Sequence, residues 1–292
     1  MFNRLILTPL LILSLWNPAI AEEVAIPFDK RQLNAELQLA EGSSLSDGVI
    51  LITHGTLAHN KMEIIATLQS LLADEGINTL AVNLSLSIDN RHGMYDCAVP
   101  HQHKHTDALQ EIDAWISWLK TQGAPAVALM GHSRGGNQSA WFSNLNPDLV
   151  SSQILVAPAT WSEASEQASY QERYGKSLSE LLTNAKQADP NSWLENTDFI
   201  YCKDSKVLAS SFVNYYQPDP QFDTPTLLKT TQVPTLVFSG TEDKVVPDLA
   251  EKMQLVTNPL VTHTVVEGAD HYFLDLYADQ IVESVIEFLG QQ

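Results

Sequence analysis

A serine stands in a glycine-rich turn at residues 131–136, which read Gly-His-Ser-Arg-Gly-Gly and follow the apolar residues 127–130. When a G-x-S-x-G turn joins a strand to a helix, the glycines let backbone segments approach closely and the serine hydroxyl stands above the sheet. The N–H groups at the start of the helix favour negative charge beside that hydroxyl. This context predicts that Ser133 is a nucleophile.

A serine hydroxyl is a weak nucleophile near neutral pH and needs a base. Of the nine histidines, His271 follows the last apolar strand pattern, within residues 268–273, Gly-Ala-Asp-His-Tyr-Phe. Asp243 follows an earlier apolar run, within residues 240–247. The order serine, aspartate, histidine is the one expected for an enzyme built around such a turn. We predict His271 as the general base and Asp243 as the acid that orients it.

Two neighbouring carboxylates, Glu242 and Asp270, are alternatives to Asp243. We favour Asp243 for its position in the motif and expect Asp270 to shape the loop that presents His271. Taken singly, Asp243 is equally compatible with a turn residue and His271 with a packed loop histidine. Their joint placement with the serine turn favours the catalytic interpretation.

An oxyanion that forms during attack on a carbonyl needs two aimed N–H donors. The backbone N–H of Arg134, the residue after the nucleophile, is the expected first donor. The second is expected from the loop after the first buried strand, where Gly55 permits close approach. We predict the N–H of Thr56, with Leu57 as the alternative, and a structural role for His54.

Strands that alternate with helices must position these groups. Continuous apolar runs are typical of strands buried on both faces, and apolar residues three and four apart indicate helices. An antiparallel pair is expected at residues 23–28 and 33–39, and further strands at 49–52, 79–82, 126–130, 154–157, 235–238 and 262–266. Helices are expected at 62–72, 107–119, from the serine turn to 142, and at 281–289. The alternation predicts an α/β fold with a doubly wound, mostly parallel sheet.

One segment interrupts the alternation, because residues 158–233 contain no apolar run that suits a sheet strand. A structureless loop of about 75 residues is unusual in a compact domain. We therefore predict an inserted helical cap at 158–233, over a core formed by residues 22–157 and 234–292. Its aromatic side chains would pack the cap or line a pocket beneath it.

Together these motifs resemble the α/β-hydrolase superfamily, and most closely its monoglyceride-lipase-like and serine-aminopeptidase-like branch. The resemblance extends from Val24 to the C-terminus, is weakest in the cap, and rests on His54-Gly55 and on residues 131–136, 240–247 and 268–271. It implies an eight-stranded sheet, a cap inserted after the sixth strand, and acyl transfer through an acyl-enzyme. Haloalkane dehalogenases and epoxide hydrolases carry aspartate where this chain has Ser133, so the serine separates it from them.

The first 21 residues have the composition of a signal peptide. Arg4 precedes the apolar residues 5–16, and residues 19–21, Ala-Ile-Ala, fit the site of a signal peptidase. The apolar run is shorter than the roughly 20 residues that a membrane span needs, and it contains Pro9. We predict cleavage before Glu22 and export to a periplasm or the medium, with no stable membrane anchor in the mature chain.

The chain is acidic, with 16 Lys and Arg against 35 Asp and Glu and a formal net charge of −19. A field of this sign repels nucleic-acid phosphates and anionic lipid surfaces. We therefore expect neither nucleic acid nor a membrane as a partner. The expected substrate is a small-molecule ester, and no cofactor is expected.

Cys97 and Cys202 are the only cysteines. A lone pair in an exported protein tends to form a disulfide. Such a bond would tie the loop that contains Cys97 to the cap that contains Cys202. Two buried free thiols are the alternative.

Histidines and aspartates are concentrated at residues 89–105, a stretch that ends with His101, His103 and His105. Imidazole and carboxylate ligands suit zinc or nickel, so these three histidines are a candidate metal site. We favour the alternative, a polar loop beside the active site that takes part in substrate selection, and therefore predict no metal.

The combined prediction is a serine hydrolase of carboxylesterase or lipase type, with Ser133, His271 and Asp243 as catalytic residues. Two alternatives stay open. A serine aminopeptidase or amidase would use the same residues and would need carboxylates of the cap to hold a substrate ammonium. The candidates are Glu163, Glu166, Glu172, Glu180, Glu195 and Asp198. A non-catalytic binding protein would keep the fold, but the intact set of reactive residues argues against it.

Overall fold

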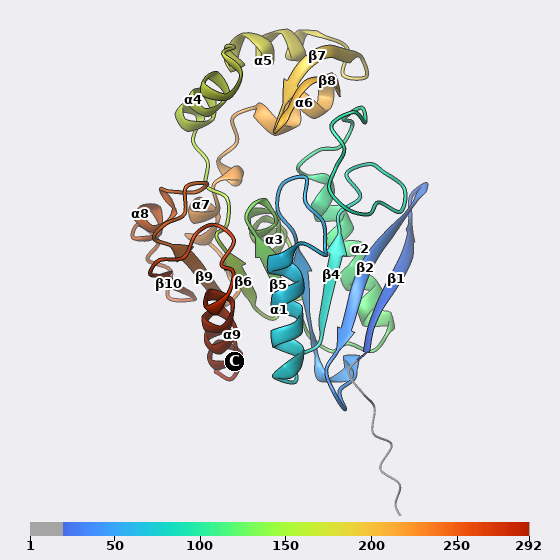
Figure 1. The fold of residues 1–292 in the computed structure, drawn as a ribbon, viewed down its shortest axis with the longest axis vertical. Coiled ribbons are helices and arrows are strands. Elements are labelled where there is room, and N and C mark those ends of the chain that lie inside the picture. The colour runs from blue at the N-terminus through green and yellow to red at the C-terminus, as the bar shows by residue number, and fades with distance from the viewer. Residues whose placement is uncertain (1–19, 292) are drawn as a thin grey trace, which may run out of the picture.

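The computed structural model describes residues 20–291. Its centre is an eight-stranded sheet in the order β1-β2-β4-β3-β5-β6-β9-β10 (Figure 1). These strands are β1 (Ile20–Phe28), β2 (Arg31–Leu39), β3 (Val49–Thr53), β4 (Thr79–Asn83), β5 (Val127–His132), β6 (Gln153–Val156), β9 (Thr235–Gly240) and β10 (Val261–Val266). The pairs β1–β2 and β2–β4 are antiparallel, and all other neighbours are parallel. The predicted doubly wound, mostly parallel sheet is confirmed.

Burial on both faces explains the composition of the central strands. Every residue of β3, β4, β5 and β6 is buried, so their sequences are continuous apolar runs rather than alternating ones. β5 lies between β3 and β6 near the middle of the sheet. Its carboxyl end therefore opens at the edge where ligands bind in doubly wound sheets.

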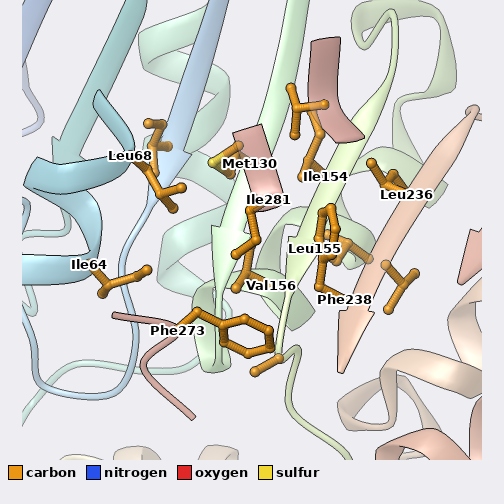
Figure 2. Close-up of a cluster of buried hydrophobic side chains, with 14 of the residues drawn as sticks. Ile64, Leu68, Met130, Ile154, Leu155, Val156, Leu236, Phe238, Phe273 and Ile281 are labelled. Carbon is orange, nitrogen blue, oxygen red and sulfur yellow. The ribbon is translucent and has the colours of Figure 1, made fainter. Parts of the chain in front are cut away.

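Four long helices cover the two faces of the sheet. α1 (Glu63–Asp74) and α9 (Leu276–Leu289) lie on one face, and α2 (Asp107–Thr121) and α3 (Arg134–Leu145) on the other (Figure 1). Figure 2 shows Leu68 of α1 and Ile281 of α9 packed over Met130 of β5 and Ile154 of β6. α9 begins earlier than expected because its first turn also packs on the core, where Ala278 is fully buried. A short helix, α8 (Leu249–Met253), follows β9.

The start of the described chain overlaps the predicted signal peptide by two residues. β1 begins at Ile20 and pairs with β2 along its whole length. The rest of the predicted peptide lies outside the described residues. No helix among residues 20–291 is long and apolar enough to cross a membrane.

The segment between β6 and β9 forms a separate layer beyond the carboxyl ends of the strands, at the top of Figure 1. This layer contains α4 (Glu163–Tyr174), α5 (Leu178–Gln187), β7 (Trp193–Phe199), β8 (Cys202–Leu208) and α6 (Ala209–Tyr216). The last helix of the segment, α7 (Thr224–Leu228), lies below the layer and packs against α3 and the core. Beside its helices, this layer contains an antiparallel hairpin of β7 and β8 that the sequence pattern did not predict. Only the last three residues of β7 are buried, so its sequence lacks the apolar run of a sheet strand.

A disulfide joins this cap to the core. Cys97, in the loop before α2, is bonded to Cys202 at the start of β8, with their Cα atoms 5.3 Å apart. The same loop pairs with β8 through two backbone hydrogen bonds of His101, to Lys206 O and from Leu208 N, each 2.8 Å long. The loop and the hairpin therefore form one connected structure above the sheet.

Candidate active site

Ser133 occupies a strained turn between β5 and α3. Its backbone angles are φ 57° and ψ −123°, a region that non-glycine residues rarely adopt. The flanking glycines make room for the turn. A Cβ on Gly131 would lie 2.5 Å from Gly135 O, and one on Gly135 would lie 2.4 Å from Thr53 O. No side chain fits at either position, so the sequence of this turn follows from its geometry.

Asp243 and His271 are joined by a hydrogen bond of 2.8 Å between Oδ2 and Nδ1. The other carboxylate oxygen, Oδ1, accepts the backbone N–H groups of Val245 at 2.7 Å and Val246 at 3.0 Å. Burial alone would raise the pKa of Asp243, but the hydrogen bond and charge of His271 and the two N–H groups outweigh it and lower this pKa. The carboxylate therefore stays ionised and fixes the proton of His271 on Nδ1.

Ser133 and His271 open onto the same cavity, which has a volume of about 310 Å³. No hydrogen bond links the two side chains in residues 20–291; such bonds are often long in unliganded enzymes. Because the His271 proton lies on Nδ1, the Nε2 atom is left as an acceptor. The apolar part of the wall is formed by Ala58, Met62, Ile64, Ile65 and Met94.

The two alternative carboxylates do not bond to His271. Asp270 Oδ1 accepts the backbone N–H of Tyr272 at 2.8 Å, so it shapes the turn next to His271. Glu242 is exposed to solvent. Of the three acidic side chains considered from the sequence, Asp243 is the one in contact with the histidine ring.

The loop after β3 passes close to the nucleophile. A Cβ on Gly55 would lie 3.2 Å from Ser133 Cβ, so the close approach depends on glycine. Thr56 lines the cavity, and its Oγ1 accepts a hydrogen bond of 2.9 Å from Arg134 Nε. Leu57 has a positive φ of 54° and packs into the apolar cluster beneath the cap. The geometry therefore favours Thr56 over Leu57 as the residue that faces the reacting centre.

His54 and Arg91 hold this loop in place. His54 Nδ1 bonds to Gly55 O at 2.9 Å, and its Nε2 accepts the Leu84 N–H at 3.1 Å. Burial, followed by the nearby Arg91 charge, lowers the pKa of His54 to about 3. The buried Arg91 donates to Leu84 O and Ala58 O. The expected structural role of His54 agrees with these contacts, whereas Arg91 was not singled out by its sequence context.

His132, next to the nucleophile, is a second residue that the sequence did not reveal. Its Nε2 donates to the backbone O of His271 at 2.8 Å. Burial, and then the His271 ring, lower the pKa of His132 to about 4, so it is neutral. It ties the serine turn to the histidine loop across 139 positions of sequence.

The three clustered histidines make different contacts. His101 Nδ1 lies 3.2 Å from His103 Nε2, and His103 Nδ1 lies 2.9 Å from Tyr215 Oη. His105 Nδ1 instead lies 3.1 Å from a terminal guanidinium nitrogen of Arg134, a cation that would oppose a bound metal. Within the described part of the chain, no three His, Cys, Asp or Glu side chains are placed to hold a metal ion. The candidate histidine metal site is therefore not assembled.

The chain matches the model of one protein family in sequence and is similar to several solved structures. The family model of the alpha/beta hydrolase family matches residues 49–284. No curated protein is detectably similar in sequence. The structure is similar to Est1E from Butyrivibrio proteoclasticus, with 18% identity, a TM-score of 0.63 and coverage of 94% of this chain and 100% of that one. It is also similar to a monoacylglycerol lipase of Paleococcus ferrophilus, with 16% identity, a TM-score of 0.59 and coverage of 88% of this chain and 98% of that one. An esterase domain of a Rhodothermus marinus protein is similar as well, with 14% identity, a TM-score of 0.59 and coverage of 91% of this chain and 96% of that one.

At these identities the structural likeness establishes the fold, and the family model establishes the ancestry. The match to the family model extends from β3 into α9, so it includes the serine turn, Asp243 and His271. The resemblance predicted from the motifs is confirmed. The chain belongs to the alpha/beta hydrolase family.

Proposed function

We propose that the protein is a serine hydrolase that cleaves a carboxylic ester, with Ser133 as nucleophile, His271 as base and Asp243 as orienting acid. The main support is the strained Ser133 turn, which opens onto the same cavity as the His271–Asp243 pair. A monoacylglycerol lipase and an esterase domain among the structural relatives favour an ester over an amide.

In the first half-reaction, Ser133 Oγ attacks the carbonyl carbon while His271 Nε2 takes the hydroxyl proton. A new C–O bond forms, and the carbonyl oxygen becomes an oxyanion. The backbone N–H groups of Thr56 and Arg134 donate to that oxyanion, which lies at the start of α3. His271 then gives its proton to the leaving alkoxide as the ester C–O bond breaks. The products are an acyl-enzyme and a free alcohol.

In the second half-reaction, water replaces the alcohol. His271 takes a proton from the water, whose oxygen attacks the acyl carbon. The bond to Ser133 Oγ breaks, and Oγ recovers its proton from His271. One ester and one water therefore give one acid and one alcohol, and the enzyme is restored. The ionised Asp243 stabilises the imidazolium that forms in both halves.

The cavity suits a small or medium apolar group. Its volume is about 310 Å³, and side chains of the α1 region, Met62, Ile64 and Ile65, form its apolar wall. Methylene groups of a substrate would gain roughly 0.8 kcal/mol each by leaving water for such a wall. We therefore expect activity to rise with acyl length up to a limit set by the cavity.

A fluorophosphonate probe tests the proposed nucleophile directly, because it phosphonylates a serine that a base activates. We expect one adduct per chain, located by peptide mass analysis on Ser133. His271→Ala should label far more slowly, and Ser70→Ala, which alters an exposed serine of α1, should label like the wild type. Absence of an adduct on folded wild type would favour a binding protein, and an adduct on another serine would reject Ser133 as the nucleophile.

We also propose that the protein is exported and that the mature chain begins at Glu22. The Cys97–Cys202 disulfide supports this, because such bonds persist in oxidising compartments. Cleavage there would leave the pairing of residues 22–28 with β2 intact. N-terminal sequencing of protein recovered from the exported fraction should begin at Glu22, and a start at Met1 would contradict export by this route.

A further inference from the structure

A second cavity, of about 440 Å³, lies between the cap and the core. Tyr201 and Val245 line both this cavity and the one onto which Ser133 opens. Arg134, the residue after the nucleophile, lines the second cavity, while its bonding partner Thr56 lines the first. The two cavities therefore adjoin at Tyr201 and Val245, close to the proposed nucleophile.

Three cations line the second cavity: Arg134, Arg173 and Lys244. Within residues 20–291, none of them has a carboxylate partner at ion-pair distance. Most Lys and Arg side chains of residues 20–291 form no ion pair, so the distinctive feature is that three such cations line one cavity. Unpaired positive side chains around a cavity are suited to a negatively charged ligand.

The two guanidinium groups are held in place by neutral partners. Arg134 Nε donates to Thr56 at 2.9 Å, one terminal nitrogen contacts His105 at 3.1 Å, and the group lies 5.2 Å from the ring centroid of Tyr215. Arg173 donates to a backbone carbonyl, and its guanidinium lies 4.5 Å from the ring centroid of Tyr201. A guanidinium has five N–H donors, so both groups keep donors for a ligand.

The acidic residues of the cavity do not cancel these charges. Asp248 forms an ion pair of 3.0 Å with Lys252 and accepts a hydrogen bond from Thr160. Glu166 is the other carboxylate in the wall. Burial raises the pKa of Glu166, and the charges of Arg134 and Arg173 act in the opposite direction. Two arginines and the exposed Lys244 thus face one free carboxylate.

We propose that the substrate is an ester that carries a carboxylate group, held in the second cavity by Arg134 and Arg173, with Lys244 at its entrance. This rests on the hydrolase function proposed above and narrows its substrate class. The planar fork of a guanidinium matches the two oxygens of a carboxylate. Arg134 is the specificity residue nearest the reaction, because it follows Ser133 directly.

Two matched pairs of esters test the proposal. The first pair is mono-4-nitrophenyl adipate and 4-nitrophenyl hexanoate, which differ by a carboxylate on the acyl side. The second pair is 4-(butanoyloxy)benzoate and phenyl butanoate, which differ by a carboxylate on the alcohol side. After subtraction of uncatalysed hydrolysis, we expect kcat/KM to be at least about tenfold higher for the charged member of one pair. The pair that shows the preference identifies the half of the substrate that enters the second cavity.

Charge variants should change this preference with opposite signs. Arg134→Gln should lower the ratio of the two kcat/KM values by about tenfold, and Arg173→Gln by a smaller factor because Arg173 is exposed. Glu166→Gln should raise the ratio. Lys120→Gln is the matched control, because Lys120 lies in the last turn of α2, at the amino ends of the strands and away from both cavities. The ratio of kcat/KM values for this variant should equal that of the wild type.

Specific results would overturn the proposal. The first is a wild-type kcat/KM for the charged ester that does not exceed that for the neutral ester in either pair. The second is a ratio of these two kcat/KM values that neither arginine variant changes. The third is a preference for 4-nitrophenyl 6-aminohexanoate, whose ammonium group would bind Glu166. Failure of the hydrolase proposal looks different, because then neither charged nor neutral esters are turned over. In that case, titration calorimetry of Ser133→Ala protein with adipate measures binding to the second cavity without turnover. Absence of adipate binding would overturn the inference.

Discussion

The two oxygens of Asp243 have separate tasks. Oδ2 accepts the Nδ1 proton of His271, and Oδ1 accepts the N–H groups of Val245 and Val246. An asparagine amide in this place would present a donor to the ring and favour the wrong tautomer. We therefore expect Asp243→Asn to lower kcat for an ester roughly 10⁴-fold with little change in fold. Asp270→Asn is the matched control and should lose less than about tenfold, because Asp270 bonds only to backbone. An equal loss in both variants would reject Asp243 as the orienting acid.

The proposed catalytic residues can be found from sequence motifs, whereas the residues that hold their loops in place cannot. Ser133, Asp243 and His271 occupy motif positions whose chemistry requires these residue types. His132 and Arg91 act through contacts with backbone atoms far away in the sequence. Such contacts depend on how loops meet in space, which a single sequence does not encode in a local pattern.

The serine turn depends on backbone packing that tolerates no side chain at Gly135. A Cβ there would lie 2.4 Å from both Thr53 O and His54 O. We expect Gly135→Ala to destabilise the fold by about 3 kcal/mol or more, because β3 or α3 must shift. Gly290→Ala, at a helical φ of −68° near the C-terminus, should change the unfolding free energy by less than about 1 kcal/mol. Equal values for both variants in urea unfolding would show that the turn is not sterically fixed.

The disulfide fastens the β7–β8 hairpin to the loop before α2. Both Met94 of that loop and Tyr201, next to Cys202, line the cavity at Ser133. We expect the double variant Cys97→Ala/Cys202→Ala to lose roughly 2–5 kcal/mol of stability in guanidinium unfolding and to show a raised KM. Reductant should lower the stability of the wild type and leave the variant unaffected. A wild type that is equally stable with and without reductant would contradict this role.

Elements were predictable to the extent that burial shapes their composition. The central strands β3, β5 and β6 are buried on both faces, so each appears as a largely apolar run. The cap rests on the core by one side, and β7 is largely exposed along its first four residues. Its partner β8 is held by the disulfide and by backbone hydrogen bonds to the loop before α2, contacts that leave no periodic pattern in the sequence.

Burial lowers the pKa of five histidine side chains in the described part of the chain and keeps them neutral. Burial lowers the pKa of His54 to about 3 and of His101 and His132 to about 4, and it holds those of His103 and His105 well below the usual value. The unfolded chain therefore binds more protons below pH 6.5, and stability is lost as the pH falls from there toward 4. Glu111 acts in the opposite direction, because burial raises its pKa to about 7. The protonated carboxyl therefore stabilises the fold at low pH, and this contribution to the unfolding free energy is lost as the pH rises through about 7.

His101 offers a test of this dependence. Its ring stacks on Tyr95 with centroids 4.7 Å apart, and phenylalanine preserves that packing without a titrating group. On passing from pH 7.5 to pH 5, we expect His101→Phe to lose about 2 kcal/mol less unfolding free energy than the wild type, because one proton uptake is removed. The comparison is between the two pH values, so any change in packing that does not depend on pH cancels. Identical losses in both proteins would contradict a neutral, buried His101.

The most direct test of the central claim is hydrolysis of 4-nitrophenyl esters of increasing acyl length by the mature protein and by Ser133→Ala. We expect the wild type to turn over with an optimum set by the cavity of about 310 Å³. Ser133→Ala should fall by at least roughly a thousandfold, as for the loss of a nucleophile from a three-residue catalytic set. A wild type that hydrolyses no ester, or a Ser133→Ala variant that retains the wild-type rate, would contradict the assignment of Ser133 as the nucleophile of an ester hydrolase.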